Sequence, residues 1–202
     1  MSITPQSPDQ LQATPPLRLG VIIGSTRQGR AGRPIADWLV AHAQPRTDYD
    51  VDLIDLAETA LPTLLPDFDV EQLPEPVVSL GERLSAADAF VVVTPEYNHS
   101  FPAALKNAID WYHEEWHAKP VGFVSYGGRA EGARAVEQLR QVFPELHATT
   151  IRDVVGIDLD MVDGRGWPVS PGCDGAAKIV LDQLAWWAQA LRTARMREPY
   201  RA

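Results

Sequence analysis

Cysteine is nearly missing from this chain of 202 residues, which contains Cys173 and no other. A single cysteine excludes an internal disulfide framework, a Cys-x-x-Cys redox pair and a cysteine-based zinc site. We expect Cys173 to be an incidental residue of a loop. A chain without internal disulfides fits the reducing cytoplasm, and we expect the protein to be located there.

Patterns typical of a signal peptide or of a membrane-spanning segment do not occur in this sequence either. The first residues contain no basic segment followed by an apolar one, so we expect no signal peptide. No apolar run approaches the roughly 20 residues that cross a bilayer. Basic residues are also fewer than acidic ones, so the formal net charge is −9 and the isoelectric point is about 5.0. This balance disfavours nucleic acid or an anionic membrane as the main partner.

Two common phosphate-binding fingerprints do not occur. The chain has no Gly-x-x-x-x-Gly-Lys-Ser/Thr, and no Gly-x-Gly-x-x-Gly follows its first apolar run. That run, at residues 19–23, instead ends in Gly24-Ser25-Thr26-Arg27, and Pro34 is suited to the first turn of the next helix. A buried strand, a small polar turn and a helix start together point main-chain N–H groups at one spot.

Arginine is concentrated beside this turn, at Arg27, Arg30 and Arg33. In an acidic chain, this cluster indicates a dianionic ligand near the start of the first helix. A terminal monophosphate such as that of FMN suits the turn better than a pyrophosphate does. The alternative from the turn alone is a set of solvated surface charges.

The chain is long enough for one domain, which we place at residues 17–202 after a disordered tail at residues 1–16. Its apolar patterns predict five strands and five helices in alternation. The expected strands are residues 17–23, 49–56, 89–94, 121–125 and 148–155, and the expected helices are residues 33–43, 77–87, 102–112, 133–143 and 176–195. Such alternation predicts a parallel sheet with helices on both faces. Pattern alone leaves a Rossmann-type strand order and the order 2-1-3-4-5 open.

Ligand chemistry is concentrated in the turns after the first, third and fourth strands. Parallel strands bring these turns to one edge of the sheet. Pro95-Glu96-Tyr97-Asn98 offers polar backbone groups, an aromatic face and an amide, which suit a flat heterocycle such as an isoalloxazine ring. Ser125-Tyr126-Gly127-Gly128 lets the backbone approach a planar ligand closely. Taken singly, either turn could be an ordinary surface loop.

Three segments together resemble the NADPH-dependent FMN reductase family of flavodoxin-like proteins. They are Gly24-Ser25-Thr26-Arg27-x-x-Arg30, Thr94-Pro95-Glu96-Tyr97-Asn98-x-Ser100-x-Pro102-x-x-Leu105-Lys106-Asn107-Ala108-Ile109-Asp110-Trp111, and residues 119–128. The resemblance covers about residues 17–156 and implies a flavodoxin-like three-layer sandwich with strand order 2-1-3-4-5. It also implies a cofactor-binding set for FMN: Ser25, Arg27 and Arg30 at the phosphate, Pro95, Glu96, Tyr97 and Asn98 at the ring, and Ser125, Gly127 and Gly128 on its other side. Gly32-Arg33 departs from the family pattern, so the last phosphate contact is either Arg30 or a neighbour.

The activity implied by the resemblance is that of an oxidoreductase. NADPH or NADH delivers a hydride to bound FMN, which reduces a quinone, free flavin or similar small acceptor in a ping-pong cycle. No catalytic side chain is required, because the flavin carries the chemistry. An electron-carrier flavodoxin and a flavin-binding sensor without significant turnover are the alternatives.

The resemblance also implies a homodimer or a dimer of dimers. Candidate contacts are the proline-rich connection at residues 57–76 and the aromatic residues Trp111, Tyr112 and Trp116. We interpret His113, Glu114, Glu115 and His117 as a helix end and expect no metal site there. Glu96 is expected to cap backbone donors or to pair with a cation.

Overall fold

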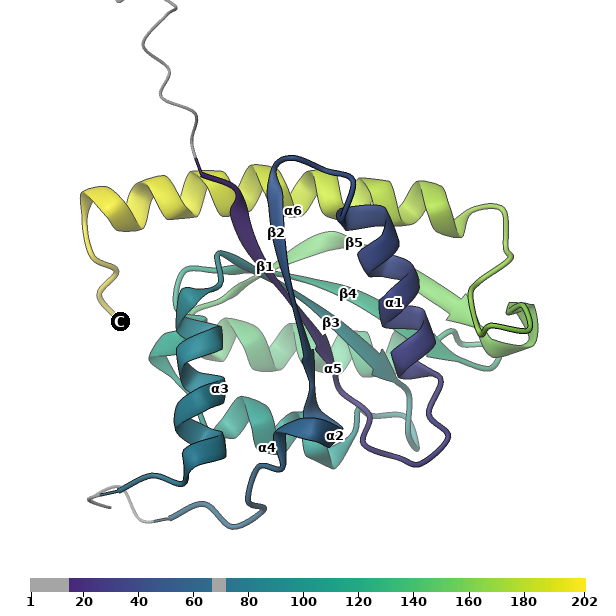
Figure 1. Cartoon of the computed structure of the whole chain (residues 1–202), viewed down its shortest axis with the longest axis horizontal. Helices are drawn as coiled ribbons and strands as arrows, with labels where there is room; N and C mark the ends of the chain where they lie inside the picture. The colour runs from purple at the N-terminus through teal and green to yellow at the C-terminus, as the bar shows by residue number, and fades with distance from the viewer. Residues whose placement is uncertain (1–14, 67–71) are drawn as a thin grey trace, which may run out of the picture.

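The computed structural model describes residues 15–66 and 72–202, which form a three-layer α/β sandwich (Figure 1). One sheet of five parallel strands has the order β2-β1-β3-β4-β5. The strands are β1 (Leu17–Ile23), β2 (Tyr49–Asp55), β3 (Ala89–Pro95), β4 (Pro120–Gly127) and β5 (Thr149–Asp158). The flavodoxin-like order is thus confirmed. Residues 1–14 of the predicted tail and residues 67–71 of the predicted connection lie outside the described residues.

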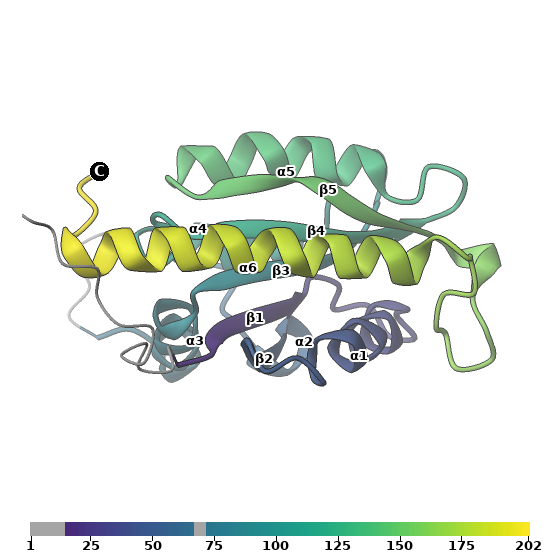
Figure 2. The ribbon, with the colours of Figure 1, turned by 90° about the horizontal axis from the view of Figure 1, so that it is seen from above.

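Helices cover both faces of the sheet, as the alternating pattern predicts. Figure 2 looks onto the face covered by α1 (Gly32–Ala43) and α6 (Cys173–Arg197). The opposite face is covered by α3 (Glu75–Ala86), α4 (Ala103–Asp110) and α5 (Ala133–Glu145). Three short elements were not expected: α2 (Leu56–Thr59) and the 3₁₀ turns η2 (Glu114–Trp116) and η3 (Leu159–Met161). None of the helices in the described ranges has the length and apolar character needed to span a bilayer.

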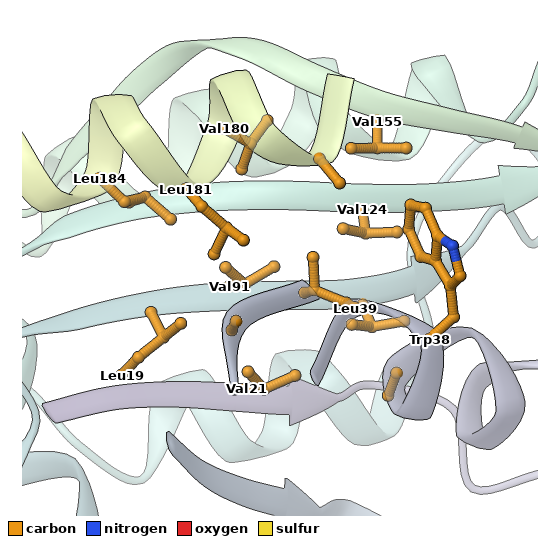
Figure 3. Close-up of a cluster of buried hydrophobic side chains, with 14 of the residues drawn as sticks. Leu19, Val21, Trp38, Leu39, Val91, Val124, Val155, Val180, Leu181 and Leu184 are labelled. Carbon is orange, nitrogen blue, oxygen red and sulfur yellow. The ribbon is translucent and has the colours of Figure 1, made fainter. Parts of the chain in front are cut away.

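The long apolar runs of the sequence are strands whose side chains are buried in a core under α1 and α6. Side chains of β1, β3 and β4 meet Trp38 and Leu39 of α1 and the apolar face of α6 (Figure 3). Strand β3 is buried along its whole length, as expected for a central strand covered on both sides.

Two expectations for α6 are wrong. Cys173 is the first residue of α6 and is buried, so it is not a loop residue. The helical spacing of Val180, Leu184 and Leu191 predicts Trp187 on the same apolar face, but Trp187 is 40% exposed. The buried face is instead formed by Cys173, Ala177, Val180, Leu181, Leu184 and Ala188. These residues recur at helical spacing, and Trp187 lies beside this face instead of on it.

Trp116 and Tyr112 are core residues, so the expectation that they contact a partner subunit is wrong. The Trp116 ring packs edge-to-face on Phe90 and Phe143, with centroid distances of 4.8 and 5.5 Å. The Tyr112 hydroxyl donates to the main-chain carbonyl of Val77 at 2.9 Å. Both side chains are buried within their own chain, because they pack in the core between the sheet and the helices on the face of α3, α4 and α5.

A cluster of three histidines lies at the opposite end of the sheet from the strand carboxyl ends. His117 Nε2 is 3.1 Å from His113 Nδ1, and the rings of His117 and His147 have centroids 5.0 Å apart. His147 Nδ1 lies 2.9 Å from the Tyr200 hydroxyl. Within residues 15–66 and 72–202, no group of three His, Cys, Asp or Glu side chains is arranged to hold a metal ion.

This cluster predicts a loss of stability in mild acid. Burial, His113 and His147 all lower the pKa of His117. An unfolded chain takes up this proton near pH 6.5, whereas the folded chain takes it up only at lower pH. The stabilising effect is therefore complete above pH 6.5 and is lost as the pH falls through the folded pKa. Between pH 7.5 and 5.5, the melting temperature should fall more in the wild type than in His117→Asn.

Differential scanning fluorimetry across this pH range measures the effect. His99→Asn is the matched control, because His99 is exposed and lies outside the cluster. This control should follow the wild-type curve. Parallel curves for the wild type and His117→Asn would show that the cluster does not sense pH.

Candidate functional site

The carboxyl ends of β1, β3 and β4 bring three turns side by side, as the sequence predicts. We call them the first turn (residues 24–30), the second turn (residues 96–100) and the third turn (residues 127–132). The Gly24 N–H donates to the Val93 carbonyl at 2.9 Å, which joins the first turn to β3. The Glu96 N–H donates to the Tyr126 carbonyl at 3.2 Å, which joins the second turn to β4.

The first turn presents main-chain donors that have no protein acceptor. Among residues 15–66 and 72–202, no oxygen accepts a hydrogen bond from the N–H groups of residues 25–30. These groups precede the start of α1, whose dipole adds positive potential. Ser25 is buried, and its hydroxyl lies 2.8 Å from that of Tyr97 in the second turn. The first turn thus has the donor geometry of an anion site.

The two arginines predicted at the phosphate differ in environment. Arg27 is exposed and makes no ion pair within the described part of the chain. Arg30 is half-buried, and its Nη2 lies 2.6 Å from Oδ2 of Asp55, whose carboxylate is buried at the end of β2. The other Asp55 oxygen accepts from the Ala57 N–H and caps α2. Arg30 is therefore already paired on one side.

The second turn is a tight hairpin held in a left-handed conformation. Tyr97 and Ser100 exchange main-chain hydrogen bonds of 2.8 and 3.0 Å. Between them, Asn98 and His99 have φ values of 51° and 67°. Gln138 of α5 holds the turn by donating to the His99 carbonyl at 2.7 Å and accepting from the Ser100 hydroxyl at 2.6 Å. The side chain of Asn98 remains exposed toward solvent.

Glu96 is paired with a cation, as the sequence analysis expects. Its carboxylate accepts from Nη1 of Arg134 at 2.6 Å and from the Arg134 main-chain N–H at 3.1 Å. Burial raises the pKa of Glu96, but the hydrogen bonds and charge of Arg134 outweigh it and hold the pKa below its ordinary value. An ionised carboxylate in an ion pair is a poor general base near neutral pH. Arg134 is occupied by the same contact.

The third turn closes on itself through glycine. Gly132 has a φ of 81°, and a Cβ atom there would lie 2.7 Å from the Cβ of Ser125. The Ser125 hydroxyl is buried and donates to the Glu131 carbonyl at 2.7 Å. Ser125 thus holds the turn, while Gly128 is exposed and has no neighbour within 4 Å of its missing Cβ. Gly128 therefore offers backbone to a ligand, whereas a Cβ atom on Gly127 would lie 3.3 Å from the Gly132 nitrogen.

All ten predicted site residues lie at this edge of the sheet, and the structure adds four others. Asp55 pairs with Arg30, Gln138 clamps the second turn, Gly132 shapes the third turn, and Tyr126 reaches from β4 toward Gly32. Tyr126 stands inside a predicted turn segment, but the strand continues through Gly127 and buries its side chain. Only the alternation of residues along the strand could have predicted that the Tyr126 side chain is buried, since successive residues of a strand face opposite sides of the sheet.

The donor set fits a flavin mononucleotide. The Arg30 Nε and the Tyr126 hydroxyl are buried without a hydrogen-bond partner within the described residues. With the unused amides of residues 25–30, they offer a phosphate several donors in one place. A cavity of about 460 Å³ lies beside the first turn and is lined by Thr26, Leu56, Ala57, Ala60, Leu61, Thr63, Ala103, Ala104 and Asn107.

Comparison with known proteins yields one family. The model of the NADPH-dependent FMN reductase family matches residues 17–161. An NAD(P)H-dependent FMN reductase of Schizosaccharomyces pombe is 36% identical over 137 residues, covering 65% of this chain and 67% of the relative. A 2-hydroxy-1,4-benzoquinone reductase of a Burkholderia species is 29% identical over 185 residues, covering 87% and 98%.

Solved structures share the fold. The chain superimposes on the flavoenzyme NAD(P)H:(acceptor) oxidoreductase of Paracoccus denitrificans with a TM-score of 0.72. The alignment covers 86% of this chain and 98% of that one, at 22% sequence identity. At that identity the likeness concerns the fold alone.

Proposed function

The chain belongs to the NADPH-dependent FMN reductase family and is an NAD(P)H-dependent flavin oxidoreductase; from this premise we propose its mechanism, acceptor class and site. With FMN bound, the protein would oxidise NADPH or NADH and reduce a quinone, free flavin or similar small acceptor in a ping-pong cycle. The observation that carries the FMN site is the set of unpartnered donors at the first turn. A quinone acceptor is supported by the name of the Burkholderia relative.

We assign the phosphate of FMN to Ser25, Arg27, Arg30 and the amides of residues 25–30. Residues 95–98 would hold the ring on one side, and Ser125, Gly127 and Gly128 would hold it on the other. When bound, FMN supplies a hydride acceptor and an electron donor.

The protein contributes binding and orientation. Gln138 fixes the second turn, and the Glu96–Arg134 pair keeps a carboxylate charge neutralised beside the ring.

Steady-state kinetics test the activity. Oxidation of NADPH is measured at several concentrations of a benzoquinone, with the holoprotein identified by its flavin absorption bands. A ping-pong cycle gives parallel double-reciprocal lines. A yellow protein that oxidises NADPH no faster with quinone than without it would instead be a carrier or a sensor. A colourless protein that stays empty after incubation with excess FMN would contradict the cofactor assignment.

Arg27→Ala should weaken FMN binding without changing stability. Arg27 is exposed and unpaired within the described residues, so its loss should alter the free energy of unfolding by less than about 0.5 kcal/mol. A charge-assisted hydrogen bond to phosphate corresponds to roughly a tenfold change in affinity or more. Titration of apoprotein with FMN, followed by flavin fluorescence, gives the dissociation constant.

Arg152→Ala is the control for Arg27→Ala, since the Arg152 side chain is 91% exposed on β5. It should bind FMN as the wild type does. Equal FMN affinity in Arg27→Ala and the wild type would remove Arg27 from the phosphate site.

We also propose a homodimer in the cytoplasm. The buried Trp116 and Tyr112 no longer support a dimer contact, but the connection after β2 does. Leu64 is 84% exposed and Leu65 is 49% exposed there, an apolar surface that a second subunit would cover. Sedimentation or light scattering of the wild type and of Leu64→Asp would test this contact.

A further inference from the structure

Tyr126 has a buried hydroxyl that the protein itself does not use. The residue is 3% exposed, and its hydroxyl has no hydrogen-bond partner among residues 15–66 and 72–202. Within residues 15–66 and 72–202, the Arg30 Nε is the only other buried side-chain donor or acceptor left in this way. Buried polar groups without partners are rare in folded proteins, and each one calls for an explanation.

Both unused donors lie at the first turn. The Tyr126 ring reaches from β4 across the sheet edge to the start of α1, where a Cβ atom on Gly32 would lie 2.7 Å from its hydroxyl. Arg30 is two residues before Gly32 and directs its Nη2 away, toward Asp55. The hydroxyl pair of Ser25 and Tyr97 closes the same region from the second turn.

At neutral pH the phenol hydroxyl of Tyr126 can donate a hydrogen bond. Burial raises the pKa of Tyr126 and the neighbouring Tyr97 adds to this. The nearby Ser25 hydroxyl, which is itself paired with the Tyr97 hydroxyl, and the charge of Arg30 act against this rise in the pKa. The phenol therefore stays protonated. A protonated phenol and a guanidinium N–H are both matched by the oxygen atoms of a phosphate dianion. Gly32 is needed at its position because any side chain would displace the phenol.

We propose that the Tyr126 hydroxyl and the Arg30 Nε are direct ligands of the flavin phosphate, an inference that rests on the proposed FMN site. Together they make the site select FMN over riboflavin, which has the same ring and ribityl chain but no phosphate. Tyr126 is thus a cofactor-binding residue supplied by the strand and not by the phosphate turn.

The test compares two ligands in Tyr126→Phe. Affinities of apoprotein for FMN and riboflavin are measured by fluorescence titration. In the variant, FMN affinity should fall about tenfold while riboflavin affinity stays the same. Thermal melting of the apoprotein is the second readout. Its melting temperature should be unchanged or higher, because the variant removes a buried hydroxyl without a partner.

Tyr49→Phe is the matched control. The Tyr49 hydroxyl is buried and donates to the Leu181 carbonyl at 2.7 Å, far from the three turns in sequence and topology. This variant should melt at a lower temperature and keep the wild-type ratio of FMN to riboflavin affinity.

Three outcomes in Tyr126→Phe would overturn the inference: unchanged affinities for both ligands with an unchanged melting temperature, an equal loss of affinity for both ligands, or unchanged affinities with a lower melting temperature of the apoprotein. The first would show no contact with the phosphate, the second a role in packing the ring, and the third a partner within the protein. Failure of the wild type to bind either flavin would instead contradict the proposed function.

Discussion

Arg30→Ala is expected to lower the free energy of unfolding by about 3 kcal/mol and to weaken FMN binding about 100-fold. The stability loss comes from Asp55, whose side chain is 2% exposed and would lose its closest cation. Breaking a buried ion pair on one side leaves an uncompensated charge, and this typically costs about 3–5 kcal/mol. The estimate lies at the low end because Asp55 keeps the Ala57 N–H and has Arg33 at 3.8 Å.

The loss of FMN affinity has a separate origin, in the contact that Arg30 would make with the phosphate. Arg30 offers its unused Nε and a full positive charge to the phosphate, so its removal deletes a charge-assisted contact and part of the local potential. Urea unfolding of the apoprotein and FMN titration measure the two effects independently.

Two further variants separate folding from binding at Arg30. In Arg30→Ala combined with Asp55→Asn, the orphaned charge is gone, so stability should partly recover while FMN affinity stays low. Arg33→Ala is the control for stability, because it removes exposed pairs with Asp37 and Glu58 and only a 3.8 Å contact with Asp55, and should cost less than about 1 kcal/mol. If Arg30→Ala unfolded at the wild-type urea concentration, the Arg30–Asp55 pair would not stabilise the fold.

Gly132→Ala is expected to destabilise the protein by about 3 kcal/mol and to abolish stable retention of FMN. At a φ of 81°, any L-residue with a Cβ is strained by about 1–2 kcal/mol. The added methyl group would also lie 2.7 Å from the Ser125 Cβ and 2.8 Å from the Tyr126 nitrogen. Overpacking of this kind costs about 1–3 kcal/mol more, and the backbone atoms involved cannot rotate away.

The third turn would have to open to relieve this clash. Opening it breaks the bond from the Ser125 hydroxyl to the Glu131 carbonyl and moves Gly127 and Gly128 away from the proposed ring position. We therefore expect an apoprotein that is folded at low temperature but loses its flavin on gel filtration. Absorbance after the column and urea unfolding are the measurements.

Gly175→Ala is the matched control for Gly132→Ala. Gly175 lies in α6 and has no atom within 4 Å of its missing Cβ. Alanine there should be neutral or stabilise the helix by up to about 1 kcal/mol, and the flavin should stay bound. Equal stability of the Gly132→Ala and Gly175→Ala variants would falsify the role given to the turn.

The local pattern of apolar residues is sufficient to predict most of the strands and helices. The apolar run of β3 is buried on both faces, and its predicted start at Ala89 agrees with the structure. The helix expected at residues 33–43 is α1, which begins at Gly32. Errors occur where packing between distant elements decides, as at Trp187, which lies beside the face that α6 buries against the sheet. Trp116 is another case, because its ring partners Phe90 and Phe143 are distant in the sequence.

By itself, the sequence determined the alternation of strands and helices and the three turns that carry ligand chemistry. It could do so because hydrophobic period and turn composition are properties of short stretches of chain. Only the tertiary structure decided which polar groups near those turns are already paired and which are free. Arg30 is paired with Asp55 and Glu96 with Arg134, whereas the hydroxyl of Tyr126 has no partner in the described residues. Such pairing joins residues 25 or more positions apart, and it depends on strand register and side-chain direction that no local pattern contains.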